Sequence, residues 1–177
     1  MELIDGLKTR RTTRAFSTRA LTRETILQIL DIARYAPSGA NKNAWRFIVT
    51  TDKSKLTTLS QMQPFSKWLA NAQAAVAIAA DPAATQYWLE DCSAAAYAIY
   101  LAGLAKGVGV AWAAVQQSAD PAEDTRRQTY ARDILSIPKE LNVPILMGLG
   151  YPQDTPLAPR KMPALEELVS WEAYGQK

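Results

Sequence analysis

An alanine-rich apolar segment, residues 87–106, constrains the fold more than any other part of this sequence. Its hydrophobic residues run around nearly the whole circumference of a helix, and Gly107 is the expected C-terminal stop. A helix without a polar face must be covered on every side. The segment is therefore predicted to be a central core helix or, as we prefer, to pack against its counterpart in a homodimer. Alanine favours the homodimer, because small side chains let two helices approach closely.

Capping residues and hydrophobic periodicity divide the rest of the chain. Strands are predicted at residues 45–51, 74–80, 108–115 and 143–151. Helices are predicted at residues 2–8, from Thr22 and from Asp52, at 64–71, from Asp120 to before Pro138, and at 165–171. We expect a single domain over residues 1–177, in which the proline-rich residues 152–177 form an extended C-terminal arm.

The composition excludes several classes of enzyme. The chain has no histidine and one cysteine, Cys92, so Ser-His-Asp and Cys-His catalysis are excluded and a metal site is not expected. The N-terminus does not resemble a signal peptide, and the longest apolar run, around residues 94–105, is too short to span a bilayer. We expect a cytoplasmic protein with no membrane partner.

Basic residues gather near the N-terminus, where six of them fall between Lys8 and Arg23. In the run Arg10-Arg11-Thr12-Thr13-Arg14, guanidinium groups and hydroxyls could grip a phosphate. A solvated charged surface and a nucleic-acid site are the alternatives, and the acidic residues spread along the chain argue against the second.

Two further segments could contribute to an anion site. Residues 37–43 are rich in small polar groups and either bind a flat polar ligand or simply connect two elements. The pair Arg160-Lys161 lies in the arm and could close on the same anion. Neither a phosphate loop nor a Rossmann fingerprint is present, because Gly107-Val108-Gly109 follows a helix and lacks the third glycine.

Two motifs resemble the FMN-dependent nitroreductase family. They are Arg10-Arg11-Thr12-Thr13-Arg14-Ala15-Phe16 and Ala36-Pro37-Ser38-Gly39-Ala40-Asn41-Lys42-Asn43-Ala44-Trp45-Arg46-Phe47, and their spacing also matches. Family members typically have Gln-Pro where this chain has Asn43-Ala44. The resemblance continues more weakly through residues 91–95, 107–112 and 148–161.

The resemblance implies an α+β fold, with a central, mainly antiparallel sheet flanked by helices in an intertwined homodimer. FMN would lie at the dimer interface, and no side chain would be catalytic, since the chemistry belongs to the flavin. Arg14 would face the flavin pyrimidine and tune it, Lys67 is a candidate contact with the flavin carbonyls, and Pro37, Ser38, Gly39 and Asn41 would come from the partner subunit. The implied cofactor-binding residues are Arg10, Arg11, Thr12, Arg14, Pro37, Ser38, Gly39, Asn41, Asn43, Trp112, Ala113, Ala114, Arg160 and Lys161.

The implied activity is ping-pong hydride transfer from NAD(P)H through FMN to a nitroaromatic, quinone or activated alkene. Two alternatives use the same scaffold. One is a specialised flavin reaction, namely dehalogenation, enone reduction or flavin fragmentation. The other is an FMN-binding protein without turnover.

Overall fold

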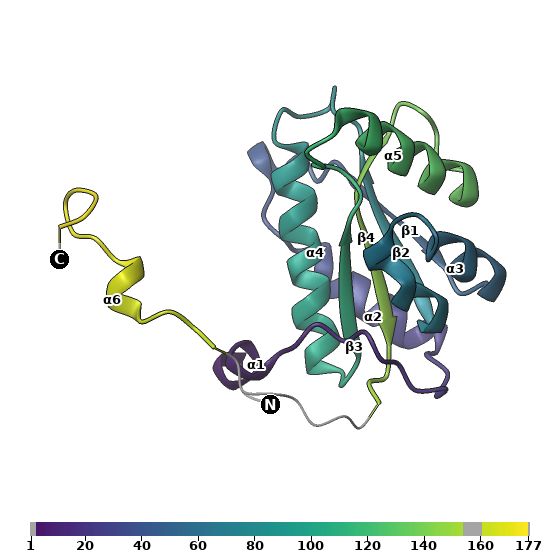
Figure 1. Ribbon diagram of the computed structural model, residues 1–177, viewed down its shortest axis with the longest axis horizontal. Helices are drawn as coiled ribbons and strands as arrows, with labels where there is room; N and C mark the ends of the chain where they lie inside the picture. Colours follow the sequence, from purple (N-terminus) through teal and green to yellow (C-terminus); the bar gives the residue numbers. More distant parts are fainter. Residues whose placement is uncertain (1–2, 154–160, 177) are drawn as a thin grey trace.

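The computed structural model describes residues 3–153 and 161–176 of the chain. Most of these residues form a body built around one sheet, from which a C-terminal arm extends (Figure 1). The elements, in chain order, are α1 (Leu3–Thr9), α2 (Arg23–Ala33), η1 (Gly39–Asn41), β1 (Trp45–Thr50), α3 (Lys53–Leu59), η2 (Pro64–Asn71), β2 (Ala74–Ala80), α4 (Trp88–Ala105), β3 (Gly109–Ala114), α5 (Pro121–Leu135), β4 (Asn142–Gly150) and α6 (Leu165–Leu168).

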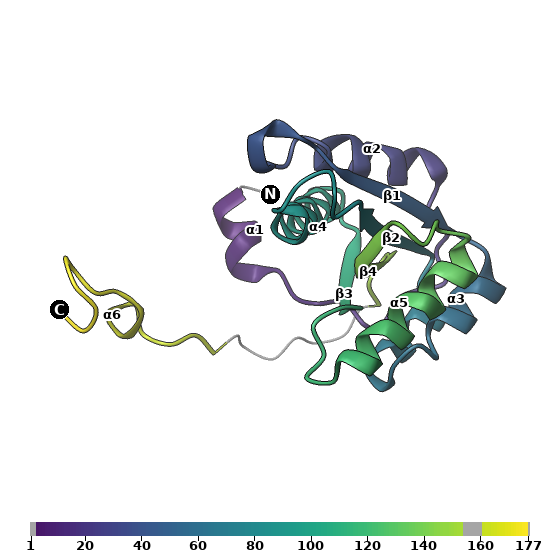
Figure 2. The same cartoon turned by 90° about the horizontal axis from the view of Figure 1, so that it is seen from above.

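The four strands form an antiparallel sheet in the order β1-β2-β4-β3. Helices α2 and α4 cover one face, while α3, η2 and α5 cover the other (Figure 2). Successive residues of β2 alternate between these layers: Val76 and Ile78 pack with α2 and α4, whereas Ala75 and Ala77 pack with α3 and η2. Because both faces are covered, β2 is a continuous apolar run. The predicted α+β fold with a mainly antiparallel sheet flanked by helices is confirmed.

Local signals in the sequence place the helix ends. The hydroxyl of Thr22 accepts a hydrogen bond from the backbone N–H of Thr25 at 3.1 Å, and Asp52 and Asp120 cap α3 and α5 in the same way. Beyond α4, Gly107 adopts a φ of +67°, which only glycine tolerates readily. These four boundaries were all predicted from the sequence.

Helix α4 is buried along one side only. Cys92, Ala95 and Ile99 face the core, whereas Tyr97 is 43% exposed. The uncovered side carries an apolar row with helical spacing, which we call the α4 stripe: Ala94, Tyr97, Leu101 and Leu104. The homodimer was predicted because a helix without a polar face must be covered on every side; the chain itself leaves this side uncovered, and the homodimer stays a prediction. Among the described residues, no helix combines the length and hydrophobicity needed to cross a membrane.

The arm, residues 161–176, lies away from the body in both views (Figures 1 and 2). Helix α6 ends at Leu168, short of the predicted 165–171, because a helix of this length gains stability mainly from packing. Large apolar side chains of the arm are exposed, namely Met162, Leu165, Leu168, Trp171 and Tyr174.

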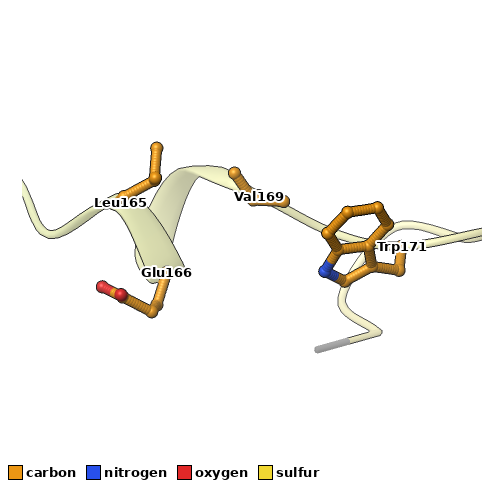
Figure 3. A pocket seen from close by; sticks show the side chains of 4 residues that line it. All are labelled: Leu165, Glu166, Val169 and Trp171. Atoms are coloured by element: carbon orange, nitrogen blue, oxygen red, sulfur yellow. The ribbon is translucent and has the colours of Figure 1, made fainter.

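A hollow of about 260 Å³ occurs within this arm. It is lined by Leu165, Glu166, Val169 and Trp171, which come from one short segment, and Glu166 lies on the opposite side of the ribbon from Leu165 (Figure 3). No cationic side chain lines it. The hollow therefore does not bring together any of the residues predicted to bind a phosphate.

Candidate functional site

The basic N-terminal segment lies along the outer edge of β3. The backbone N–H of Thr13 donates to the carbonyl oxygen of Val110 at 3.0 Å, and Phe16 forms a β-bridge with Pro152. A side chain at Gly109 would obstruct this approach, because its Cβ would lie 2.5 Å from the Thr13 hydroxyl oxygen. The glycine thus lets the segment reach the sheet edge.

An anion pocket of about 280 Å³ lies between this segment and the C-terminal half of α4. Arg10, Arg11 and Thr13 line it together with Tyr100. The Arg10 guanidinium carbon lies 4.9 Å from the centroid of the Tyr100 ring, a cation–π contact that orients it. The Tyr100 hydroxyl also donates to the carbonyl oxygen of Arg11 at 3.3 Å. Two guanidinium groups and a hydroxyl at one pocket suit a phosphate group. Thr12 is half-buried and does not line this pocket.

Arg14 lies in a different, polar pocket of about 430 Å³. Lys53, Asn71 and Gln73 line it as well, and the Lys53 ammonium donates to a backbone carbonyl at 2.7 Å. The sequence did not predict these three residues as part of the pocket. It suggested Lys67 instead, but the Lys67 side chain is exposed on η2 and does not line the pocket. The sequence did predict that a helix ends near Asn71, and this was its one indication of that position.

The free edge of β3 adds backbone donors between these pockets and the C-terminal end of the strand. Val115 donates its N–H to β4, and hydrogen-bonding direction alternates along an antiparallel strand. The N–H groups of Trp112 and Ala114 therefore point away from β4, whereas that of Ala113 points toward it. The Gln63 side-chain amide donates to the Ala114 carbonyl at 3.2 Å and ties η2 to this end of the strand.

The loop of residues 37–43 folds tightly upon itself. Ala40, Asn41 and Asn43 have φ values of 48°, 55° and 48°, in the left-handed region. The N–H of Asn43 donates to the hydroxyl oxygen of Ser38 at 3.0 Å, and its side-chain amide donates to the Asn41 carbonyl at 3.0 Å. The amide of Asn43, which stands where the family usually has Gln, thus bonds to its own loop. Pro37 is exposed beside it.

This loop and the arginines contact the same helix at different heights. The N–H of Gly39 donates to Asp91 in the first turn of α4, while Arg10 lies on Tyr100. Nine residues separate Asp91 from Tyr100, which corresponds to about 13 Å along a helix axis. The structure therefore does not bring the two motifs into one cluster within a single chain.

Two residues of the arm, Arg160 and Lys161, were also predicted to contribute to the anion site. Arg160 lies outside the described residues. Lys161 is exposed at the start of the described arm, which leads away from the body. The structure does not bring Lys161 to the anion pocket of its own chain.

Comparison with known proteins identifies the family. The model of the nitroreductase family matches residues 7–71, which contain both N-terminal motifs. A protein of Archaeoglobus fulgidus, provisionally named NADH dehydrogenase/NAD(P)H nitroreductase, is 38% identical over 157 residues, covering 86% of this chain and 87% of that protein. An FMN-dependent nitroreductase of Clostridium difficile superposes with a TM-score of 0.87 at 30% identity, covering 97% of this chain and 99% of the other.

A third likeness concerns the fold alone. A nitroreductase-fold protein of Desulfovibrio desulfuricans, solved in complex with FMN, has a TM-score of 0.81 at 21% identity and covers 98% of each chain. The extent and identity of the Archaeoglobus match decide the assignment, and they agree with the resemblance seen in the two motifs. The chain belongs to the nitroreductase family.

Proposed function

We propose that the protein is an FMN-dependent oxidoreductase that uses NAD(P)H to reduce a small organic acceptor. The observation that carries this proposal is the N-terminal segment lying along the β3 edge, with the anion pocket on one side and the Arg14 pocket on the other. FMN has a phosphate and a flat polar ring system, so this set of donors suits both of its ends. The FMN-dependent relative from Clostridium difficile supports the same cofactor.

When bound, FMN supplies the redox chemistry by accepting hydride from NAD(P)H and passing electrons to the acceptor. The chain binds and orients it. We propose that Arg10, Arg11 and Thr12 hold the phosphate and ribityl chain, with Arg160 or Lys161 joining from an arm. The outward N–H groups of Trp112 and Ala114 would donate to the ring edge.

We further propose that two copies of the chain complete each site. The α4 stripe would form the seam, because its apolar side chains are not fully covered by their own chain and suit a helix-to-helix contact. The loop of residues 37–43, which lies about 13 Å along α4 from the arginines of its own chain, would then serve the partner's cofactor. The nitroaromatic, quinone or activated-alkene classes are the proposed acceptors.

The test begins with purified protein incubated with FMN and desalted. We expect stoichiometric retention of a yellow cofactor and, on adding NADH or NADPH, bleaching that oxidised acceptor reverses. A panel of nitroaromatics, quinones, enones and halogenated phenols then separates general from specialised chemistry. Protein that remains colourless would contradict the proposal, and a yellow protein that NADH and NADPH do not bleach would leave only FMN binding.

Replacing Arg14 by Ala is expected to make the flavin two-electron potential more negative by about 30 mV. A cation beside the pyrimidine stabilises the negative charge of the reduced ring. Two unit charges about 4 Å apart attract each other by about 1 kcal/mol in water and by more near a protein surface. A loss of about 1.4 kcal/mol corresponds to about 30 mV for a two-electron couple. Spectroelectrochemical titration of the holoenzyme measures the shift, with Lys55→Ala on α3 as a control that removes a cation outside the pocket. An unchanged potential would exclude Arg14 from the pyrimidine edge.

A further inference from the structure

Asp91, in the first turn of α4, is a polar side chain held in an unusual environment. It is 4% exposed, and one carboxylate oxygen, Oδ1, accepts a hydrogen bond from the Gly39 N–H at 2.8 Å. The other oxygen, Oδ2, is buried and has no hydrogen-bond partner among the described residues. Buried carboxylates normally satisfy both oxygens, because an unsatisfied charged group is costly to bury. Asp91 is therefore poorly suited to a purely stabilising role.

The bond to Gly39 has a particular place in the structure. Within the described part of the chain, it is the only hydrogen bond that joins residues 37–43 to another element; the others remain inside the loop. The loop also holds Ala40, Asn41 and Asn43 in left-handed conformations, which cost energy unless the surroundings enforce them. One contact from α4 thus fixes where a strained loop sits.

The packing around Gly39 makes this contact specific. A Cβ at Gly39 would collide with the ring of Tyr87, so the backbone must approach α4 closely for its N–H to reach the carboxylate. Tyr87 is the N-cap residue of α4, and its carbonyl oxygen accepts from the Asp91 N–H at 2.8 Å. Two hydrogen bonds therefore connect Tyr87 at the start of α4, Asp91 in its first turn and the loop backbone at Gly39.

We infer that Asp91 is a positioning residue that holds loop 37–43 in the conformation in which it lines a ligand site, acting through the Gly39 N–H and not by touching the ligand. This inference rests on the proposed function in one respect, that the site lined by the loop is an FMN site. What matters for positioning is an acceptor at Oδ1. The negative charge is not required for it, since an amide oxygen can accept the same hydrogen bond.

The experiment compares three variants at Asp91. Asp91→Ala removes the acceptor, Asp91→Leu removes it while keeping volume, and Asp91→Asn restores it without charge. Glu90→Ala, which removes the neighbouring exposed carboxylate, is the control. Hydrogen exchange of residues 38–43 in the FMN-free protein is read first, and FMN affinity is then measured by fluorescence quenching.

We expect Asp91→Ala and Asp91→Leu to speed exchange in the loop and to weaken FMN binding about tenfold, the effect of losing one hydrogen bond to a charged group. Asp91→Asn should stay within about threefold of the wild type in both measurements, with a melting temperature that does not fall. Glu90→Ala should match the wild type.

Two results would overturn the inference. One is wild-type exchange and affinity in Asp91→Leu, and the other is equal losses in Asp91→Asn and Asp91→Leu, which would assign the effect to charge. If Asp91→Ala fails to fold, Asp91→Leu and Asp91→Asn still decide. A wild type that binds no FMN refutes the proposed function alone, because loop exchange continues to report on Asp91.

Discussion

If the protein forms the proposed homodimer, substituting Leu101 with Glu is expected to convert it from dimer to monomer and to release FMN. Leu101 lies in the α4 stripe and is only half-buried in the isolated chain, so the substitution is compatible with folding. In the proposed seam it would leave a carboxylate buried without a partner. Such a charge costs at least about 3 kcal/mol, which weakens association more than a hundredfold. Each cofactor site would also lose the loop supplied by the other chain.

Sedimentation velocity and flavin absorbance after desalting measure both effects on one sample. Thr57→Glu provides the control, because it adds the same charge to an exposed position on α3, on the opposite face of the sheet. A Leu101→Glu protein that stays dimeric and yellow would exclude the α4 stripe as the seam. A monomer that retains FMN at wild-type affinity would show that one chain completes the site.

The second large effect is expected for Arg10→Ala, which should weaken FMN binding by roughly 1.5–3 kcal/mol, or about 10- to 150-fold. The substitution removes a charged hydrogen-bond donor from the anion pocket while Tyr100 keeps its bond to Arg11. Riboflavin, which lacks the phosphate, should bind equally to the variant and the wild type.

Arg19→Ala is a matched control for this change. Arg19 also stacks on a tyrosine, with 3.8 Å between its guanidinium carbon and the centroid of the Tyr151 ring, yet it does not line the anion pocket. It should retain FMN as the wild type does. Unchanged FMN affinity in Arg10→Ala would place the phosphate elsewhere, and equal losses of FMN and riboflavin would point to a general packing defect.

The sequence predicted those parts of the fold that depend on neighbouring residues. Thr22, Asp52 and Asp120 marked helix starts because a cap acts within three residues, and β2 was recognised because a strand covered on both faces is apolar throughout. The prediction for helix α6 was too long. Its hydrophobic periodicity indicated a helix that packs against a partner, and its own chain does not provide that partner.

The site was predicted less completely, and for a physical reason. The two N-terminal motifs were visible because their residues are consecutive, whereas Lys53 and Gln73 reach the Arg14 pocket only through the folding of α3 and η2. The bond between Gly39 and Asp91 joins positions 52 residues apart. No local sequence pattern predicts such a pairing, so the hydrogen bond that anchors the loop could be found only in the structure.

The distance of about 13 Å along α4 between Asp91, which anchors the loop, and Tyr100, on which Arg10 lies, also bears on genetic complementation. If each site takes its arginines from one chain and its loop from the other, substitutions at Arg10 and at Asp91 affect different halves of a site. In a mixed dimer of a chain defective at Arg10 and a chain defective at Asp91, one site carries both defects and the other carries none. Two inactive alleles would then restore activity in a mixed dimer, whereas two alleles that affect the same half of the site would not.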